Sequence, residues 1–347
     1  MRSKTLLATV MAGALLTGLT VAGADATGRD DRVAQAFGAT TRSTAWSQVA
    51  RIPLRFPTYH PQGFALVGDL IFLSSVEVLE APVPYPKPVD GYDRSPGRGI
   101  GHLFVMDRQG NLKKDILVGE GTAYHPGGID YDGENVWVPT AEYRPNSRAI
   151  VYKVNPKTYQ VTEQFRVNDH VGGVVRDRRT GLVHGVSWGS RTLFEWTASG
   201  KQLAAEANQS HLLDYQDCDY VSRSKQLCGG VTGLPTATGG SYELGGLALL
   251  DLKDHNRILH EIPFPAFSTA GHSVHPQPGG DGGRRPEAAP FHGSRRRRGS
   301  DRNRAAGLRI ADQLARGTIR AGMSCWWQRA SRPVPSISCS GSPLANW

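Results

Sequence analysis

An internal repeat constrains the fold of this 347-residue chain more than any other feature. Residues 60–73 align without gaps on residues 125–138, so that His60 and the proline after it fall on His125 and its own proline. Further copies begin at His170, near Asp217 and at His272, with uneven spacing of the kind that loop insertions produce. Repeats of this size bury their apolar faces only by stacking on their neighbours, as in solenoids, propellers and arrays.

Each copy is predicted to form four short strands. In the second copy we expect strands at residues 128–131, 135–140, 149–154 and 160–167, separated by Asp-Gly, Pro-Asn-Ser and Asn-Pro-Lys turns. No ten-residue amphipathic helix intervenes, so the pattern predicts an all-β fold, a β-propeller of five blades with four strands each. We expect residues 46–54 to supply an N-terminal closing strand. Six blades are the alternative if the insertion after Leu79 contains a further one.

The N-terminus has the pattern of a signal peptide, because Arg2 and Lys4 precede an apolar segment at residues 6–22 and small residues surround Ala26. We therefore expect residues 1–26 to be removed by cleavage after Ala26, and the mature protein to be secreted with no membrane span. An uncleaved anchor is the alternative. Residues 27–44 are expected to be a disordered linker, and residues 45–274 the propeller.

Export would permit disulfide bonds. Cys218 and Cys228 flank nine residues symmetrically, as cross-strand neighbours in a short hairpin would, so we expect them to form a disulfide.

The composition changes abruptly at His275. Residues 275–347 contain 13 arginines and no lysine, and they account for the whole net charge of +9, so the rest of the chain is neutral and a nucleic-acid partner is not expected. A basic tail is the simple interpretation. If codons are read from their second base, however, His275 and the next three residues become Thr-Arg-Asn-Pro, and alternating strand patterns follow. We therefore predict a single-base slip at codon 274 or 275, a last blade disrupted after residue 274, and a mostly disordered tail.

In a propeller, the starts of the innermost strands lie on one face around the central channel. The chemistry-bearing residues at the repeat starts are His60, His125, His170 and His272, with Asp217 or Asp219 in the fourth copy. Imidazole and carboxylate groups suit a divalent metal such as Zn²⁺ or Ca²⁺. The alternative is a purely structural role, in which each histidine only hydrogen-bonds the backbone of a neighbouring blade.

Two glutamates are candidates for acid and base chemistry. Glu77 and Glu142 both end second strands, and each lies seventeen residues after the histidine of its copy. His184 falls inside a second strand and is expected to be a packed core residue.

Aromatic and arginine residues accompany these groups. Tyr143, Arg144, Trp188 and Arg191 are candidate substrate-binding residues that suit a sugar or a carboxylate. Residues 80–101, rich in proline, tyrosine and glycine, form either a lid or a solvated insertion.

Several segments together, including FPTYHPQG, YHPGGIDYDG, HVGGVV and LGGLALLDL, resemble a family of secreted β-propeller proteins of unknown function. That family is distantly similar to gluconolactonase-like and strictosidine-synthase-like propellers. The resemblance runs from about residue 46 to residue 272. It implies the fold and a secreted setting, and it assigns neither a reaction nor a catalytic residue.

The sequence therefore predicts a secreted propeller whose channel mouth holds a divalent metal and acts on a small extracellular ester, lactone or sugar. The alternative is a non-catalytic propeller that binds a glycan, a peptide or a cell-envelope partner. A monomer is expected, and whether the chain is an enzyme stays open.

Overall fold

The structure, a computed structural model, describes residues 32–46, 51–264 and 266. Within this part of the chain the strands form a β-propeller with four blades, and no helix has the length and apolar character needed to cross a membrane. His272, Cys325, Cys339 and the whole of 275–347 lie outside the described residues.

The first two blades are antiparallel sheets whose strands follow one another outward along the chain. Blade 1 consists of β1 (His60–Val67), β2 (Leu70–Glu80), β5 (Arg98–Asp107) and β6 (Leu112–Val118). Blade 2 consists of β7 (Ala123–Pro126), β8 (Asp130–Tyr131), β9 (Val136–Glu142), β10 (Ala149–Val154) and β11 (Val161–Val167). Its inner strand is interrupted, because β7 and β8 both pair with β9.

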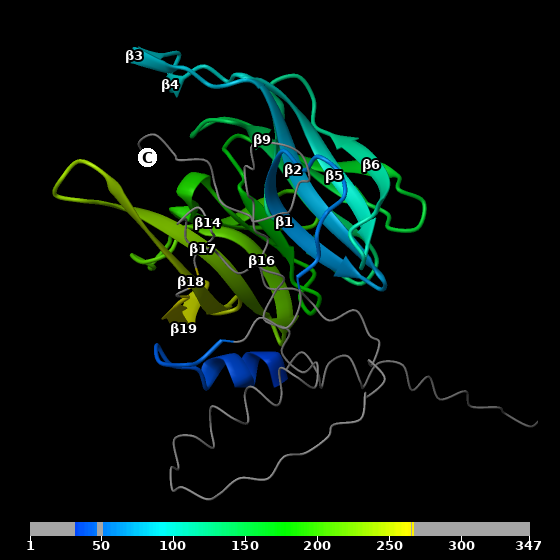
Figure 1. The fold of residues 1–347 in the computed structure, drawn as a ribbon, viewed down its shortest axis with the longest axis vertical. Helices are drawn as coiled ribbons and strands as arrows, with labels where there is room; N and C mark the ends of the chain where they lie inside the picture. Colours follow the sequence, from blue (N-terminus) through cyan, green and yellow to red (C-terminus); the bar gives the residue numbers. More distant parts are fainter. Residues whose placement is uncertain (1–31, 47–50, 265, 267–347) are drawn as a thin grey trace, which may run out of the picture.

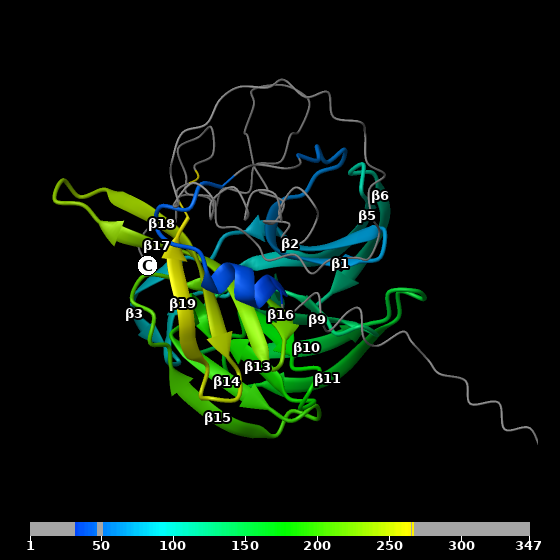
Figure 2. The ribbon, with the colours of Figure 1, turned by 90° about the horizontal axis from the view of Figure 1, so that it is seen from below.

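The other two blades have the same plan. Blade 3 consists of β12 (Gly173–Arg176), β13 (Val183–Val186), β14 (Thr192–Trp196) and β15 (Gln202–Ala207), with a 3₁₀ turn at Trp188–Ser190. Blade 4 consists of β16 (Tyr215–Ser222), β17 (Lys225–Pro235), β18 (Ser241–Asp251) and β19 (Arg257–Pro263). In Figure 2 the four sheets fan out around a common centre, with β6, β11 and β15 at the periphery.

Burial along the strands follows from this radial order. The second and third strands of a blade, such as β9, are buried on both faces because neighbouring blades pack against them. The outermost strands β6 and β15 are mostly exposed. The strands therefore carry continuous apolar runs near the centre and polar residues at the rim.

Apolar clusters join successive blades. One lies between blades 1 and 2, one between blades 2 and 3, and one between blades 3 and 4. Two others cover the remaining faces: blade 1 packs against Leu54 and Phe56, and blade 4 packs against Ala34, Phe37 and Trp46. Among the described residues, no apolar cluster joins blade 4 to blade 1.

Asp217 fills the centre of the channel. Its two carboxylate oxygens accept hydrogen bonds from the backbone amides of Phe64 (3.1 Å) and Ile129 (2.9 Å), so it links blades 1, 2 and 4. A Cβ atom on Gly63 or Gly128 would lie 2.7 Å from the same carboxylate oxygen, so both positions require glycine. The inner strands of blades 1 and 2 thus approach closely around the Asp217 carboxylate.

Two expectations for the N-terminal part differ from the structure. Residues 32–38, placed in a disordered linker, form a helix, and Ala34 and Phe37 on it pack against blade 4. For the closing strand, residues 47–50 lie outside the described part and residues 51–54 are not a strand, although Leu54 packs on blade 1.

The hairpin disulfide is confirmed. Cys218 and Cys228 are direct partners in the pairing of β16 with β17, and their sulfur atoms are bonded.

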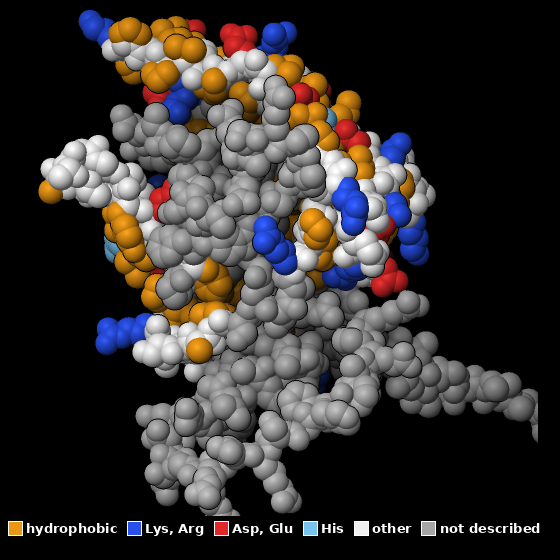
Figure 3. All heavy atoms as spheres, in the orientation of Figure 1, with side chains coloured by type: hydrophobic (Ala, Val, Ile, Leu, Met, Phe, Trp, Pro, Cys, Tyr) orange, Lys and Arg blue, Asp and Glu red, His pale blue; other side chains and the backbone are white. Residues whose placement is uncertain are grey.

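The insertion at residues 80–101 forms an arm above the end of the blades (Figure 1). Strands β3 (Pro84–Val89) and β4 (Tyr92–Arg94) pair as a small hairpin on extensions of β2 and β5. Figure 3 shows hydrophobic, acidic and basic side chains together on this hairpin, and Val83 and Val89 are exposed.

Candidate functional site

Three repeat-start histidines lie together. His60 opens β1, His125 lies in β7, and His170 lies three residues before β12. The ring centres of His60 and His125 are 6.0 Å apart, and those of His125 and His170 are 6.2 Å apart. The equivalence of the first three repeat copies therefore places imidazoles from three blades side by side.

His125 is the central and most enclosed of the three. It is buried, and neither of its ring nitrogens has a hydrogen-bond partner among the described residues. Burial, reinforced by the nearby His60 and His170, lowers the pKa of His125 well below its usual value. Burial also lowers the pKa values of His60 and His170 to about 4. All three rings are therefore neutral near pH 7.

The backbone fixes the tautomer of His170. Its Nδ1 lies 2.9 Å from the carbonyl oxygen of Glu142, and a carbonyl only accepts, so Nδ1–H is the donor. Nε2 therefore carries a free lone pair, which suits a proton acceptor or a metal ligand.

Two aromatic side chains complete this group. Tyr143 follows β9 and stacks on His125 with ring centres 4.1 Å apart, while Trp188 meets His170 edge-on at 4.8 Å. His60, Tyr143 and Trp188 are partly exposed, so solvent reaches the group. We call His60, His125, His170, Tyr143 and Trp188 the histidine–aromatic cluster.

Glu142 stands beside this cluster with both carboxylate oxygens occupied. Oε1 accepts from Thr122 (2.6 Å) and Arg148 (3.0 Å), and Oε2 accepts from Arg144 Nε (2.7 Å). Burial raises the pKa of Glu142, but these hydrogen bonds outweigh it and hold the pKa below its usual value. Such a carboxylate stays ionised and anchors its neighbours, which argues against a proton-transfer role.

The hairpin arm reaches this site through Tyr92 and Arg94. The Arg144 guanidinium lies over the Tyr92 ring, 3.4 Å from its centre, and donates to the backbone oxygen of Arg94 at 3.4 Å. The Arg94 guanidinium lies 5.3 Å from the centre of the Trp188 ring. Tyr92 and Arg94 of the insertion thus lie beside the histidine–aromatic cluster, while most of β3 is exposed.

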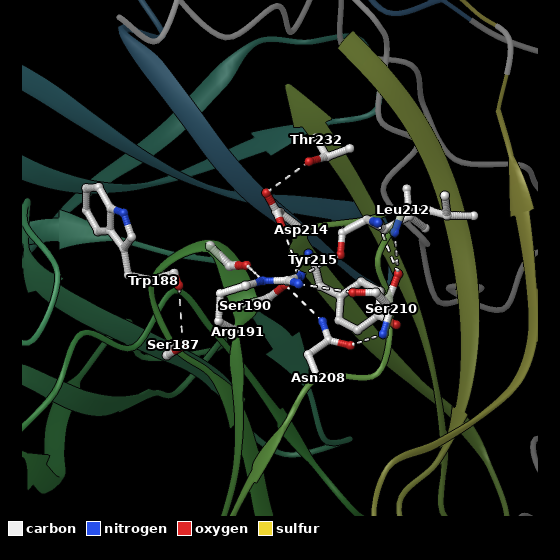
Figure 4. A network of polar contacts seen from close by, with 12 residues as sticks. Ser187, Trp188, Ser190, Arg191, Asn208, Ser210, Leu212, Asp214, Tyr215 and Thr232 are labelled. Carbon is white, nitrogen blue, oxygen red and sulfur yellow. Dashed lines mark hydrogen bonds and ion pairs between the residues drawn. The ribbon is translucent and has the colours of Figure 1, made fainter. Parts of the chain in front are cut away.

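Arg191, another candidate ligand-binding residue, is committed to the protein (Figure 4). Its guanidinium donates to the carbonyl oxygens of Gly189, Ser210 and Leu213 at 2.8 to 3.0 Å, and it pairs with Asp214 at 2.8 Å. Figure 4 shows the Trp188 ring pointing away from this network. The network fixes the turn at Trp188–Ser190 and thereby the position of Trp188.

The fourth copy contributes an acid that sequence comparison misplaced. Gly63, Gly128, Gly173 and Asp217 lie at one level of the channel, and the residues three positions earlier are His60, His125, His170 and Asp214. Asp214 is therefore the counterpart of the histidines. Burial raises its pKa, and Arg191 opposes that effect. Asp217, predicted to be a metal ligand, lies deeper and gives both oxygens to backbone amides.

The structure places Glu77 next to another histidine. Glu77 Oε2 is 3.7 Å from His102 Nε2, and Asp115 Oδ1 is 3.0 Å from His102 Nδ1. Tyr59, whose φ of 51° lies in the left-handed region, stacks on the His102 ring. Glu77 therefore belongs to a separate polar group on blade 1, with His102 and Asp115.

Ser187 is the central serine of Gly185-Val-Ser-Trp-Gly189, which matches the G-x-S-x-G pattern of serine hydrolases. Its hydroxyl accepts from the backbone amide of Thr192 at 2.8 Å, and within the described part of the chain no imidazole is hydrogen-bonded to it. Its backbone is ordinary and extended, unlike the strained turn of a nucleophile elbow. The pattern is therefore structural here.

His184 lies in β13 as a buried residue, and burial lowers its pKa to about 4. No group of three or more His, Cys, Asp or Glu side chains in the described ranges is arranged to hold a metal ion as it stands.

Comparison with known families gives a match over most of the chain. The model described as "Family of unknown function (DUF6454)" matches residues 33–315, and the chain belongs to that family. The match ends inside the segment for which a shifted frame is predicted. No curated protein matches the sequence.

Solved structures show only distant similarity. The chain resembles a chain of a nidogen/laminin complex (TM-score 0.35, 9% identity, covering 60% of this chain and 82% of that one). It also resembles a luciferin-regenerating enzyme (0.32, 9%, covering 47% and 50%). A third is the β-propeller domain of the Trilobed protease from Pyrococcus furiosus (0.31, 10%, covering 65% and 62%). The chain thus spans half to about four fifths of these structures.

Proposed function

We propose that this family member binds a small extracellular molecule with a ring, such as an ester, a lactone or a sugar, at the histidine–aromatic cluster. The observation that carries the proposal is His125, a buried side chain with two unpartnered ring nitrogens. Burying polar groups without hydrogen bonds is costly, so such groups are usually satisfied by water or a ligand. Tyr143 and Trp188 supply aromatic faces against which a sugar or lactone ring packs.

The pKa values limit the chemistry that the cluster supports. A base whose pKa is about 4, as for His170, is deprotonated at pH 7 but accepts a proton only weakly. Such a base favours binding, or the opening of an already reactive lactone, over cleavage of an amide. In lactone opening, water would attack the carbonyl and pass a proton to His170 Nε2, and the leaving alkoxide would recover that proton.

The test follows the histidine ring signals by NMR while D-glucono-1,5-lactone or methyl glucoside is added, and it measures lactone opening by acid release. We expect His125→Gln to abolish the response. His184→Gln is the matched control, because His184 is also buried with both ring nitrogens unpartnered but lies in β13. Unchanged binding in a folded His125→Gln protein would refute the site.

A divalent metal is the second candidate ligand, favoured by three neutral imidazoles in one cluster. Bonds of about 2.0 to 2.1 Å from Zn²⁺ to each nitrogen require the rings to converge, and ring centres 6.0 and 6.2 Å apart require them to move inward. Zinc titration followed by metal analysis separates the two candidates. Stoichiometric zinc that is lost in His125→Gln and kept in His184→Gln supports the metal; metal-free protein that binds the lactone excludes it.

We also propose that the native propeller has five blades. The support is the pair of separate apolar clusters on blades 1 and 4, because in a closed ring these two faces would pack on a blade between them. The residues for that blade would follow residue 264, in the shifted frame from codon 274 or 275. The family match to residue 315 in the printed frame is a point against the slip. Sequencing the locus decides between the frames.

Secretion is part of the proposal and rests on the N-terminal pattern and on the hairpin disulfide. Expression in a secreting host followed by N-terminal sequencing tests it. The mature protein should be recovered from the medium and begin at Thr27, whereas a cell-bound product that retains Arg2 would contradict it.

A further inference from the structure

The segment from Tyr92 to Pro96 is held over the histidine–aromatic cluster by blade 2. At one end the Arg144 guanidinium supports the Tyr92 ring and the backbone of Arg94. At the other end, the Tyr124 hydroxyl donates to the backbone oxygen of Pro96 at 2.7 Å. A cation on an aromatic face and two hydrogen bonds therefore position the residue between them, Arg94.

This placement brings a positive charge to the cluster. The Arg94 side chain is 25% exposed and lies over Trp188. Burial raises the pKa of Tyr143, and the nearby charge of Arg94 partly offsets this effect. Asp93, its own chain neighbour, pairs with it at 2.8 Å and is 47% exposed. Nε and Nη2 of Arg94 hold both Asp93 oxygens at 2.8 to 3.2 Å, so a carboxylate ligand pairs with Arg94 only by displacing this bidentate contact.

Three acidic groups near the cluster already bind other groups of the protein. Glu142 is occupied by Thr122, Arg144 and Arg148, and Asp214 is paired with Arg191. Asp169 accepts from the backbone amide of His170 at 2.7 Å. A cationic ligand would be repelled by the guanidinium, whereas an anion would meet the guanidinium and the single N–H of a neutral His60 or His125 ring. Nε2 of His170 presents a lone pair and offers no donor.

We infer that the ligand of this site carries a carboxylate, and that Arg94 is the residue that selects it. The inference rests on the proposed function, because it assigns a substrate class to the same cluster. The ligand ring would pack on Trp188 or Tyr143 while its carboxylate pairs with Arg94. Sugar acids and aromatic acids fit this description, and uncharged sugars fit it less well.

The experiment compares benzoate with benzamide, probes of nearly equal size of which only one is charged. NMR signals of the histidine rings report binding in the full-length protein. We expect benzoate to bind at least tenfold more tightly than benzamide and to raise the apparent pKa of a ring in the cluster. Arg94→Gln should remove this preference, and Arg94→Lys should retain part of it.

Arg98→Gln is the matched control, because Arg98 belongs to the same insertion, is 72% exposed and pairs only loosely with Glu80 at 3.8 Å. It should leave both affinities unchanged. Equal binding of the two probes by the wild-type protein, or an unchanged preference in Arg94→Gln, overturns the inference while leaving the site intact. If neither probe shifts the histidine signals, the inference fails, and the lactone and glucoside titration decides the proposed function separately.

Discussion

Two buried aspartates in the channel offer a quantitative test of the fold. Asp130 and Asp219 follow Gly128 and Asp217 by two residues, and they are 1% and 4% exposed. Asp130 accepts from the backbone amides of Arg176 and Tyr220, whereas Asp219 Oδ2 has no hydrogen-bond partner among the residues that the structure describes. Burial raises the pKa of Asp130 from 3.8 to about 6. Burial, Asp217 and Asp130 raise that of Asp219 well above 3.8, and Arg178 offsets this in part.

The sign of the effect follows from linkage. A carboxyl group whose pKa is higher in the folded state than in the unfolded state destabilises the fold at neutral pH, and this cost is relieved as the pH falls. For Asp130, a shift of about two units corresponds to about 3 kcal/mol at pH 7. Asp219 is shifted in the same direction and repels Asp130 and Asp217, so its removal should also relieve a cost to folding at neutral pH.

We therefore expect Asp219→Asn to raise the free energy of unfolding by about 1–4 kcal/mol at pH 7, because the amide keeps the shape and carries no charge. The advantage should shrink as the pH falls from the raised folded-state pKa of Asp219 toward 3.8. The buried histidines act in the opposite sense, since their lowered pKa values cost stability as the pH falls. They are present in both proteins, so they cancel in the difference.

Urea unfolding followed by tryptophan fluorescence at pH 5, 6 and 7, with the disulfide intact, measures these differences. Glu134→Gln, an exposed change in the turn after β8, is the control and should shift nothing. A variant no more stable than the wild type at pH 7, or an advantage that grows on acidification, would refute the reasoning.

Three further outcomes are expected. Replacing Cys218 and Cys228 by serine should lower the free energy of unfolding by about 2.5 kcal/mol, the loop-closure cost for a separation of 10 residues, and urea unfolding of reduced wild-type protein should agree. Gly128→Ala places a Cβ 2.5 Å from the backbone oxygen of Gln216 and should cost at least about 2 kcal/mol in thermal unfolding, whereas Gly38→Ala meets nothing within 4 Å and should be nearly neutral. Arg144→Gln removes a partner of the buried Glu142 carboxylate and should lower the free energy of unfolding by about 3 kcal/mol, with faster hydrogen exchange at residues 92–96. The control is Arg148→Gln: because the Arg148 side chain is 66% exposed, this change should have smaller effects on both measurements.

The sequence predicted strand boundaries correctly where a turn motif ends the strand. In blade 2 the predicted strand at 149–154 and the observed β10 coincide, because Pro-Asn-Ser and Asn-Pro-Lys turns fix its two ends. The hairpin disulfide was predictable for the same reason, since symmetric flanks predict a direct cross-strand pair. Such signals depend only on neighbours along the chain.

The features that the sequence patterns did not predict are determined by contacts between residues far apart in the chain. The helix at residues 32–38 is too short for helical periodicity to be recognised, and it is fixed by Ala34 and Phe37 on blade 4. Glu77 and Glu142 have the same spacing from their histidines, yet Glu77 contacts His102 while Glu142 binds two arginines. Residues at equivalent positions in two copies thus have different partners, because the partner residues are not part of the repeat.

The fourth copy shows why this matters for the site. Because this copy lacks a histidine, the sequence alignment placed its start at Asp217, three residues too late. The close approach of Asp217 to Gly63 and Gly128 shows that these three residues are equivalent positions in their copies. The counterpart of the histidines, Asp214, is held by Arg191. The imidazoles therefore come from blades 1 to 3, so a bound ligand should lie off the channel axis on that side. Arg94 lies beside Trp188 on that side, so the asymmetry of the repeat supports the carboxylate-selective site that we infer.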